Sequence, residues 1–243
     1  MLGWFASDCA CPSTMVDRIV PATTEAGRAE LAARIGLADY GAVMTEPFSQ
    51  WVIEDRFVGP RPRWEAVGAQ LVSDVRPYET AKLRMLNGAH SLLAYVGLAQ
   101  GHTYVHQAVA DPAIRALAMH LLREEAAPTI AAAPGQDLPA YASALLDRFA
   151  NPALEHKLIQ IAMDGSQKIP QRWLETLAEN QRKGRDCPAI RVGITTWISH
   201  LRGTNGPVYD PRAADLAMAA ASPDPVSALF GAAGLLASQW NPQ

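Results

Sequence analysis

The chain has 243 residues, of which 49% are hydrophobic and 19% are charged, and its formal net charge is -3. This composition is ordinary for a globular protein with a substantial core, and the charge gives no reason to expect nucleic-acid binding. No stretch reaches the roughly 18 apolar residues needed to cross a bilayer, and residues 1–6 lack the basic start of a signal peptide. We therefore expect a cytoplasmic protein that binds neither nucleic acid nor a membrane.

The three cysteines do not form a disulfide framework. Cys9 and Cys11 have the spacing of a metal-binding pair, but no histidine stands near them at ligand spacing. The remaining thiol, Cys187, is far away in the sequence. We therefore expect no metal site.

The first part of the chain is predicted to be mostly loop with one clear helix. Residues 1–20 favour a loop followed by a short extended piece. Thr23 or Thr24 can cap a helix that Gly36 ends. Residues 47–57 are rich in β-branched and aromatic side chains, which favour extended structure.

From Trp64 onward the pattern is helical. Pro77 suits the first turn of a helix over residues 77–96, and a helix beginning at Asn151 is expected to reach Met163. Prolines open further predicted helices, at residues 112, 170, 188, 211 and 225. No segment alternates strictly between polar and apolar residues, so about seven to nine packed helices are the simplest architecture. The predicted fold class is therefore all-α.

The most informative stretch lies within the helix predicted at residues 77–96. With about 100° of rotation per residue, four polar side chains share one side, at about 0°, 60°, 80° and 140°: Lys82, Glu79, His90 and Asn87. Asn87 is followed by a glycine, and both residue types weaken a helix interior. A broken local rule in the middle of a helix indicates a functional site.

Lys82-x4-Asn87-x2-His90 resembles the catalytic signature of the mannitol dehydrogenase family, the polyol-specific long-chain dehydrogenases and reductases. Three further sequence blocks are similar to family blocks and stand in family order, at residues 12–19, 46–54 and 160–172. The resemblance implies a metal-independent, NAD- or NADP-dependent oxidoreductase of carbohydrate metabolism. Such an enzyme interconverts a sugar alcohol or aldonate with its keto sugar, as fructuronate reductases and mannitol 2-dehydrogenases do.

The resemblance also implies catalytic roles. Oxidation of a secondary alcohol needs a base for the hydroxyl proton, and in the family the lysine at the position of Lys82 is this general acid/base. Asn87 would donate its amide to the developing alkoxide, and His90 would orient a hydroxyl of the substrate. Without the motif, a surface lysine paired with Glu79 and a histidine buried in the core would be the simpler interpretations.

Three more residues are assigned to substrate binding by the same resemblance. Lys168 matches a substrate-binding lysine, and Glu79 matches a glutamate implicated in proton or water passage. Asp17 lies in the family at a domain junction and would position cofactor or substrate; alternatively, it pairs with Arg18 or caps a turn. Gln160 stands where mannitol-specific members carry an arginine, which argues against mannitol as the preferred substrate. The run at residues 160–168 resembles the fructuronate reductases, and broader bacterial polyol enzymes share it.

The chain contains no G-x-G-x-x-G turn, whereas in the family a Rossmann-type domain with that fingerprint precedes the helical domain. We therefore expect residues 1–20 to be a remnant of the junction with that domain. Residues 21–243 would form a helical substrate domain, similar to the carboxyl-terminal domain of 6-phosphogluconate dehydrogenase and truncated at its end. NAD or NADP would be bound mainly by a domain absent from this chain, and the chain alone would be inactive.

A second hypothesis is that the chain is a non-catalytic helical remnant, or a split subunit, that binds a partner chain. The two hypotheses differ over the cofactor domain. A glycine-rich βαβ unit encoded upstream or in an adjacent gene would favour the enzyme, and its absence would favour the remnant.

Overall fold

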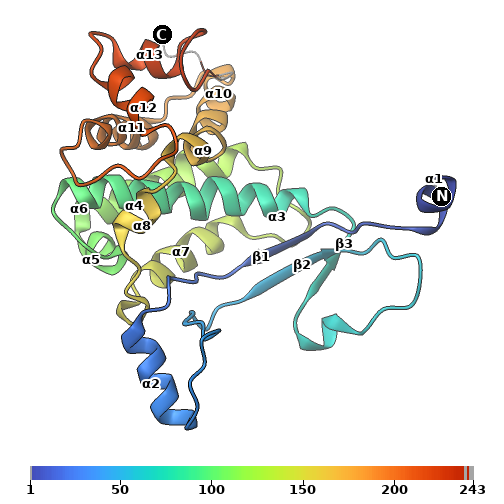
Figure 1. Ribbon diagram of the computed structural model, residues 1–243. Coiled ribbons are helices and arrows are strands. Elements are labelled where there is room, and N and C mark those ends of the chain that lie inside the picture. The colour runs from blue at the N-terminus through green and yellow to red at the C-terminus, as the bar shows by residue number, and fades with distance from the viewer. Residues whose placement is uncertain (1, 238–239, 241–243) are drawn as a thin grey trace. The chain divides into compact units, whose positions relative to one another are not determined.

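The computed structural model describes residues 2–237 and residue 240. The chain divides into two compact units, Met1–Thr80 and Ala81–Gln243, and each is described by itself. Figure 1 shows their helices and strands. None of the helices in the described part combines the length and the apolar character that crossing a membrane requires.

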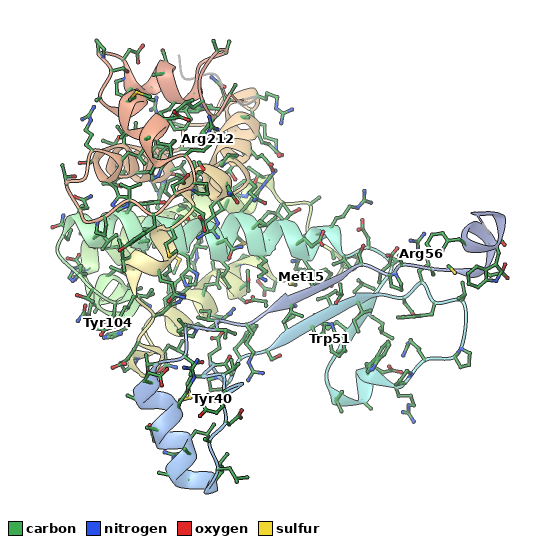
Figure 2. The ribbon with its side chains drawn as sticks, viewed as in Figure 1. Met15, Tyr40, Trp51, Arg56, Tyr104 and Arg212 are labelled. Carbon is green, nitrogen blue, oxygen red and sulfur yellow. The ribbon has the colours of Figure 1, made fainter. Side chains whose placement is uncertain are left out.

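The first unit contains a three-stranded sheet. The order is β1 (Thr14–Asp17), β2 (Gln50–Glu54) and β3 (Gln70–Val72), with β1 antiparallel and β3 parallel to β2 (Figure 1). Met15 and Trp51 lie on neighbouring strands (Figure 2). The prediction of an all-α fold is therefore correct only in part. The strands were missed because each is too short to show the alternation of polar and apolar residues that marks a strand in a sequence. The extended piece predicted within residues 47–57 is confirmed by β2.

The helices of the first unit follow the prediction at one place and depart from it at two. The helix α2 (Glu25–Ile35) is capped by the Thr24 side chain and ends at Gly36, as predicted. Residues 1–20 contain a helix that was not predicted, α1 (Leu2–Asp8). The helical pattern predicted from Trp64 onward is wrong at its start. Only one 3-10 turn forms there, η1 (Trp64–Val67), and it ends at a glycine in the left-handed region. The next helix, α3 (Arg76–Ala81), begins after β3.

The second unit is built around one buried helix, α4 (Gly88–Ala99). Every residue from Gly88 to Gly97 is buried, as expected of a helix that is apolar on all sides. Four helices pack against it (Figure 1): α5 (Val105–Ala110), α6 (Pro112–His120), α8 (Leu158–Ala162) and α11 (Pro188–Leu201). Side chains carried by α4 are therefore held by packing from several directions.

The remaining elements of this unit begin mostly at the polar and proline signals found in the sequence. Asp111, Asp137 and Asp224 each accept a hydrogen bond from the first turn of a helix that starts with or near proline. The helices and 3-10 turns not yet given are α7 (Leu138–Phe149), α9 (Gly165–Ile169), α10 (Glu175–Arg182), α12 (Ala213–Ala220), α13 (Pro225–Phe230), η4 (Ala127–Thr129) and η5 (Pro152–Leu154).

The helix predicted from Asn151 to Met163 is wrong. The 3-10 turn η5 ends at Glu155, whose φ of 43° lies in the left-handed region and stops the helix. A second short helix, α8, then begins at Leu158. A glutamate rarely adopts a positive φ, so the sequence gives no signal for this break.

Among the described residues, three helical stretches contain a π-helical turn: η2 (Lys82–Asn87), η3 (Leu121–Ala126) and η6 (Pro170–Leu174). The turn η2 packs against both of the others. All three were predicted as ordinary α-helix. π turns are uncommon and recur at functional sites. The contacts of η2 with the other two therefore indicate this part of the second unit as a candidate functional site.

Candidate active site

The turn η2 carries two of the predicted catalytic residues, with Lys82 at its start and Asn87 at its end. A π turn takes up one residue more than an α turn, so the side chains after it rotate back by about 100°. Relative to Lys82, Asn87 then moves from about 140° to about 40°, and His90 from about 80° to about -20°. The three side chains therefore share a narrower face than an unbroken α-helix would give them.

The carboxyl end of η2 is held by two side chains of η6. Arg172 Nη1 donates to the Ser91 hydroxyl at 2.8 Å and to the Asn87 carbonyl oxygen at 3.4 Å. Trp173 Nε1 donates to the Gly88 carbonyl oxygen at 3.0 Å. The side-chain amide of Asn87 makes no hydrogen bond to the residues that the structure describes. Its backbone is thus fixed while its amide is available to a ligand.

His90 lies in the first turns of α4 and is buried. Its ring centroid is 4.4 Å from that of Phe149 and 5.4 Å from that of His156. Its Nε2 is buried and has no hydrogen-bond partner among the described residues. Burial first, and then the neighbouring His156 and Arg172, hold the pKa of His90 well below its ordinary value of 6.5. The imidazole is therefore neutral at physiological pH.

Lys168, in α9, is partly buried, and its Nζ donates to the carbonyl oxygen of Ile161 at 3.4 Å. Burial, followed by the positive charge of Arg172, lowers the pKa of Lys168, while Asp164 and Asp210 act in the opposite direction. Arg172 is itself deep enough that burial lowers its pKa to about 10. Two cations close together in a partly buried place favour a negatively charged or oxygen-rich ligand.

The backbone before Lys168 is tightly fixed. Asp164 has a φ of 56°, and Ser166 bonds to both carboxylate oxygens of Asp210, with its backbone N–H and its hydroxyl at 2.8 Å each. A Cβ on Gly165 would lie 2.6 Å from Trp197 Nε1, so no side chain fits there. The Asp-Gly-Ser sequence is thus explained by packing that sets the direction of the helix carrying Lys168.

Two other predicted site residues, Asp17 and Glu79, belong to the first unit. Asp17 ends β1, pairs in register with Gln50 and is fully buried. Glu79 lies in α3 and is partly buried. Within the second unit, the structure brings Asn87 and His90 to one end of α4, near Arg172 and next to the turn that Lys82 begins.

Sequence reasoning missed two polar residues of this region, Arg172 and His156. Arg172 stands in the block at residues 160–172 that carries the family resemblance, so a signal for it was present. His156 follows the unexpected break at Glu155, and nothing in its local sequence indicates a role. Gln160, which is partly buried, lies in the same segment.

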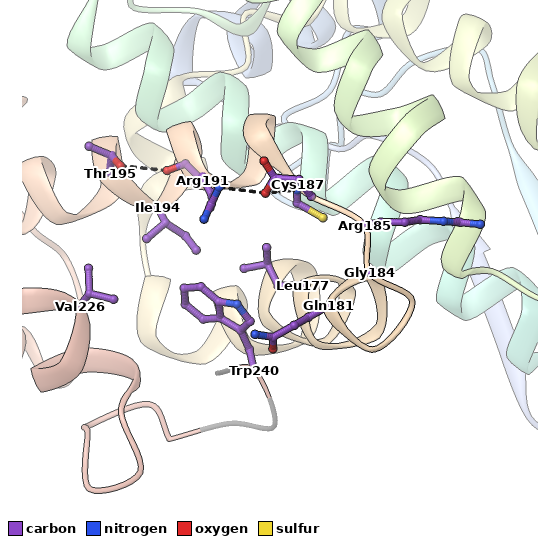
Figure 3. Close-up of a pocket in the computed structure, with 11 residues that line it drawn as sticks. Leu177, Gln181, Gly184, Arg185, Cys187, Arg191, Ile194, Thr195, Val226 and Trp240 are labelled. Atoms are coloured by element: carbon purple, nitrogen blue, oxygen red, sulfur yellow. Dashed lines mark hydrogen bonds and ion pairs between the residues drawn. The ribbon is translucent and has the colours of Figure 1, made fainter. Parts of the chain in front are cut away.

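A cavity of about 500 Å³ lies elsewhere in the second unit, and it contains none of the predicted site residues (Figure 3). Its lining includes Arg185, Trp240 and Cys187, and Arg191 on its wall is paired with Asp186 at 2.9 Å. Burial raises the pKa of the Cys187 thiol to about 12, so this thiol is unreactive. In the described part of the chain, no three His, Cys, Asp or Glu side chains are grouped as a metal site would need.

Comparison with known families matches nearly the whole chain in two parts. The family model for the mannitol dehydrogenase C-terminal domain matches residues 74–228. The model for the mannitol dehydrogenase Rossmann domain matches residues 1–66. The boundary between the two matches lies close to the division between the two structural units.

Curated relatives include the D-mannonate oxidoreductase of Escherichia coli (strain K12), which is 43% identical over 98% of this chain and 50% of its own length. A mannitol 2-dehydrogenase of Phaeosphaeria nodorum is 39% identical over 94% of this chain and 42% of its own length. A D-arabinitol 4-dehydrogenase of Ralstonia nicotianae is 40% identical over 94% and 50%, respectively. The chain thus spans about half the length of the curated relatives it matches.

Among solved structures, the Pseudomonas fluorescens mannitol 2-dehydrogenase in a ternary complex with NAD and D-mannitol matches with a TM-score of 0.84. It is 34% identical, and the match covers 96% of this chain and 49% of that one. The sequence matches and the structural match therefore indicate the same family. This chain belongs to the mannitol dehydrogenase family.

Proposed function

We propose that this chain supplies the substrate-binding and catalytic half of an NAD(P)-dependent oxidoreductase that interconverts a polyol or aldonate with its keto sugar. The observation that carries the proposal is the π turn that gathers Lys82, Asn87 and His90 on one narrow face. The names of the relatives, which are mannonate, mannitol and arabinitol oxidoreductases, support the same class of reaction.

In the proposed reaction, Lys82 takes the proton from the substrate hydroxyl, and in the reverse direction it returns the proton to the keto oxygen. The Asn87 amide donates a hydrogen bond to that oxygen as negative charge develops on it. Neutral His90 holds a neighbouring hydroxyl and so orients the reacting carbon. We assign Glu79 to proton passage and Asp17 to positioning, without a direct chemical step for either.

The nicotinamide would accept or supply the hydride. This chain does not fit the whole dinucleotide by itself, because its sequence has no glycine-rich turn between a strand and a helix to hold the pyrophosphate. We therefore assign the cofactor mainly to a domain outside this sequence and propose that the chain alone is inactive. We propose no catalytic role for a metal.

For the substrate we propose an aldonate and its keto acid, of the mannonate and fructuronate type. Lys168 and Arg172 form a positive region that suits a carboxylate. Gln160 is neutral at a position where the family resemblance implies an arginine in mannitol-specific members. A neutral polyol such as mannitol would use the same hydroxyl contacts but would gain nothing from the positive charge.

The proposal is tested by joining the chain to the part of the E. coli D-mannonate oxidoreductase that it does not match, in the order found in that relative. NADH oxidation would be followed with fructuronate and with fructose. We expect turnover of the joined protein, faster with fructuronate, and no turnover by the chain alone. A folded joined protein that oxidises NADH with neither substrate would contradict the proposed function.

A second candidate function is that of a partner-binding subunit without turnover. Large exposed apolar side chains are concentrated in the first unit, where Tyr40 is 85% exposed and Val67 is 82% exposed. Exposed apolar surface of this kind favours contact with another chain. A joined protein without turnover, together with binding of the chain to a separate cofactor-binding subunit, would favour this function.

A further inference from the structure

His156 stands in a segment whose backbone is held in an unusual conformation at both ends. Glu155 and Asp164 have φ values of 43° and 56°, and they are the non-glycine residues with positive φ in the part of the chain that the structure describes. Such conformations cost of order 1–3 kcal/mol each and persist where the surrounding structure enforces them, often at functional sites. The position of His156 is further fixed because its carbonyl oxygen accepts from Val105 N at 3.0 Å.

The fixed segment brings the imidazole of His156 edge-on to that of His90, with ring centroids 5.4 Å apart and planes at 84°. Phe149 covers His90 from another direction, with ring centroids 4.4 Å apart. Two nitrogens of this pair, His90 Nε2 and His156 Nδ1, are buried and have no hydrogen-bond partner among the described residues. A buried polar atom without a partner costs about 1–3 kcal/mol, so both nitrogens call for an additional group.

The charge state of the two rings limits what that group can be. Burial lowers the pKa of both histidines, so both rings are neutral near pH 7. A neutral imidazole offers one N–H donor and one acceptor nitrogen. A hydroxyl group is also donor and acceptor, so one hydroxyl can accept from one ring and donate to the other. A carboxylate has only acceptors, so it would fit only if both of these nitrogens carried the proton of their ring.

A metal cation is disfavoured at this place. Arg172 and Arg148 act on His90 with the same sign, and their positive charge lowers its pKa. The same positive charge would repel a bound cation. The two nitrogens therefore suit a neutral hydroxyl.

We propose that His156 is a second polyol-binding residue, and that His90 and His156 together hold one hydroxyl group of the substrate chain. This inference rests on the proposed function, because it places a second ligand beside the histidine already assigned to substrate orientation. The pair would select a ligand with a hydroxyl next to the reacting carbon and would reject a deoxy analogue, which leaves both nitrogens unpaired.

The test uses the full chain labelled with ¹⁵N-histidine and D-mannitol as the probe, because mannitol has hydroxyls but no carboxylate. We expect the imidazole ¹⁵N signals of His90 and His156 to shift together as mannitol is added. His156→Phe keeps a ring but removes both nitrogens, and it should weaken mannitol binding about tenfold, as expected for the loss of one hydrogen bond. The matched control is His200→Phe, which also removes a buried histidine with an unpartnered Nδ1 and should leave binding unchanged within about twofold.

Three results would contradict the inference. They differ in whether they also contradict the proposed function. If mannitol shifts the His90 signal but not that of His156, and His156→Phe binds mannitol as well as the parent, the inference is wrong and the proposed function stands. If the parent chain binds D-mannonate but neither ligand shifts the His156 signal, only the inference is contradicted. If the parent chain binds neither mannitol nor D-mannonate, both the inference and the substrate-binding role in the proposed function are contradicted. The shift of the His156 signal in the parent chain decides the matter even if the variant does not fold.

Discussion

Glu125 and His90 are both buried in or beside π turns of the second unit, and they differ in whether the protein supplies their hydrogen-bond partners. Glu125 lies in η3 and is fully buried, and its two carboxylate oxygens accept from Ala189 N at 2.6 Å and from Ile190 N at 2.9 Å. It thereby caps the amino end of α11, where a negative charge is favourable. His90, which follows η2, keeps a buried nitrogen without a partner among the described residues.

The comparison shows that a π turn by itself does not mark a catalytic site. In η3 the turn places a carboxylate where the fold satisfies it, and burial, the largest influence, raises the pKa of Glu125 while the two backbone N–H groups oppose that rise. At the carboxyl end of η2, Arg172 and Trp173 bond to the carbonyl oxygens of Asn87 and Gly88 and to the Ser91 hydroxyl. The Asn87 amide and His90 Nε2 have no hydrogen-bond partner among the described residues. We infer that Glu125 serves stability and that the face on η2 serves chemistry.

The largest expected effect is that of Lys82→Ala in the joined protein. Loss of a general acid/base should lower kcat by about 10³–10⁴, near the upper end of what such a group contributes. The free energy of unfolding should change by less than about 1 kcal/mol, because Lys82 is only partly buried. Steady-state kinetics and urea unfolding check both values. Lys157→Ala, at an exposed lysine of the same unit, is the control and should behave as the parent.

Asn87→Ala should have the next largest effect. The variant removes one hydrogen-bond donor to the developing alkoxide, and kcat should fall by about 10²–10³ while KM changes little. Kinetics with saturating substrate measure this separation. If instead KM rose by about 10²–10³ and kcat were unchanged, Asn87 would contribute to substrate binding and not to the chemical step.

Glu125→Ala should lower the stability of the fold and leave catalysis nearly unchanged. The variant leaves two backbone N–H groups buried without an acceptor, so the free energy of unfolding should fall by about 2–5 kcal/mol. Chemical unfolding of the chain itself measures this loss, and kcat of any folded joined variant should stay within about threefold of the parent, because the site on η2 is not touched. If the loss in kcat, expressed as a free energy, exceeded the loss in the free energy of unfolding, Glu125 would have a catalytic role and would not differ from the residues on η2 in this respect.

The smallest expected effect is a dependence of stability on pH. Burial lowers the pKa of His90, His156 and His200 below 6.5 in the folded chain. Below pH 6.5 the unfolded chain therefore binds protons that the folded chain does not, and the folded state loses stability as pH falls toward the folded pKa values. Each histidine contributes a slope of up to about 1.4 kcal/mol per pH unit in that window. Urea unfolding between pH 7 and pH 5 should show this loss, and it should be smaller in His200→Phe.

The features that follow local rules were predictable from the sequence. Thr24 and Gly36 bound a helix as caps, and Asp111 and Asp224 open helices together with the prolines after them. The Lys82, Asn87 and His90 spacing identified the family, and with it the region of the candidate site. These signals lie within a few residues of the structure they specify.

What could not be predicted depends on contacts between distant segments. The π turn at η2 adds one residue to a helix without disturbing its apolar pattern, and its carbonyl oxygens are bonded by Arg172 and Trp173, about 85 residues away. The left-handed conformation of Glu155 has no sequence signal, so the neighbourhood of His156 was missed as well. Such features become visible only once the helices are packed.

The most direct test of the central claim is chemical rescue of Lys82→Ala in the joined protein by a small primary amine. If Lys82 acts by carrying the proton, an amine that enters the vacated space should restore part of the lost rate, increasingly as pH rises and more of the free base is present. The rescued rate should saturate with amine concentration, and Asn87→Ala should gain nothing from the amine. A Lys82→Ala protein that keeps near-parent kcat/KM from about pH 6 to pH 10 without any amine would contradict the claim that this face carries the chemistry.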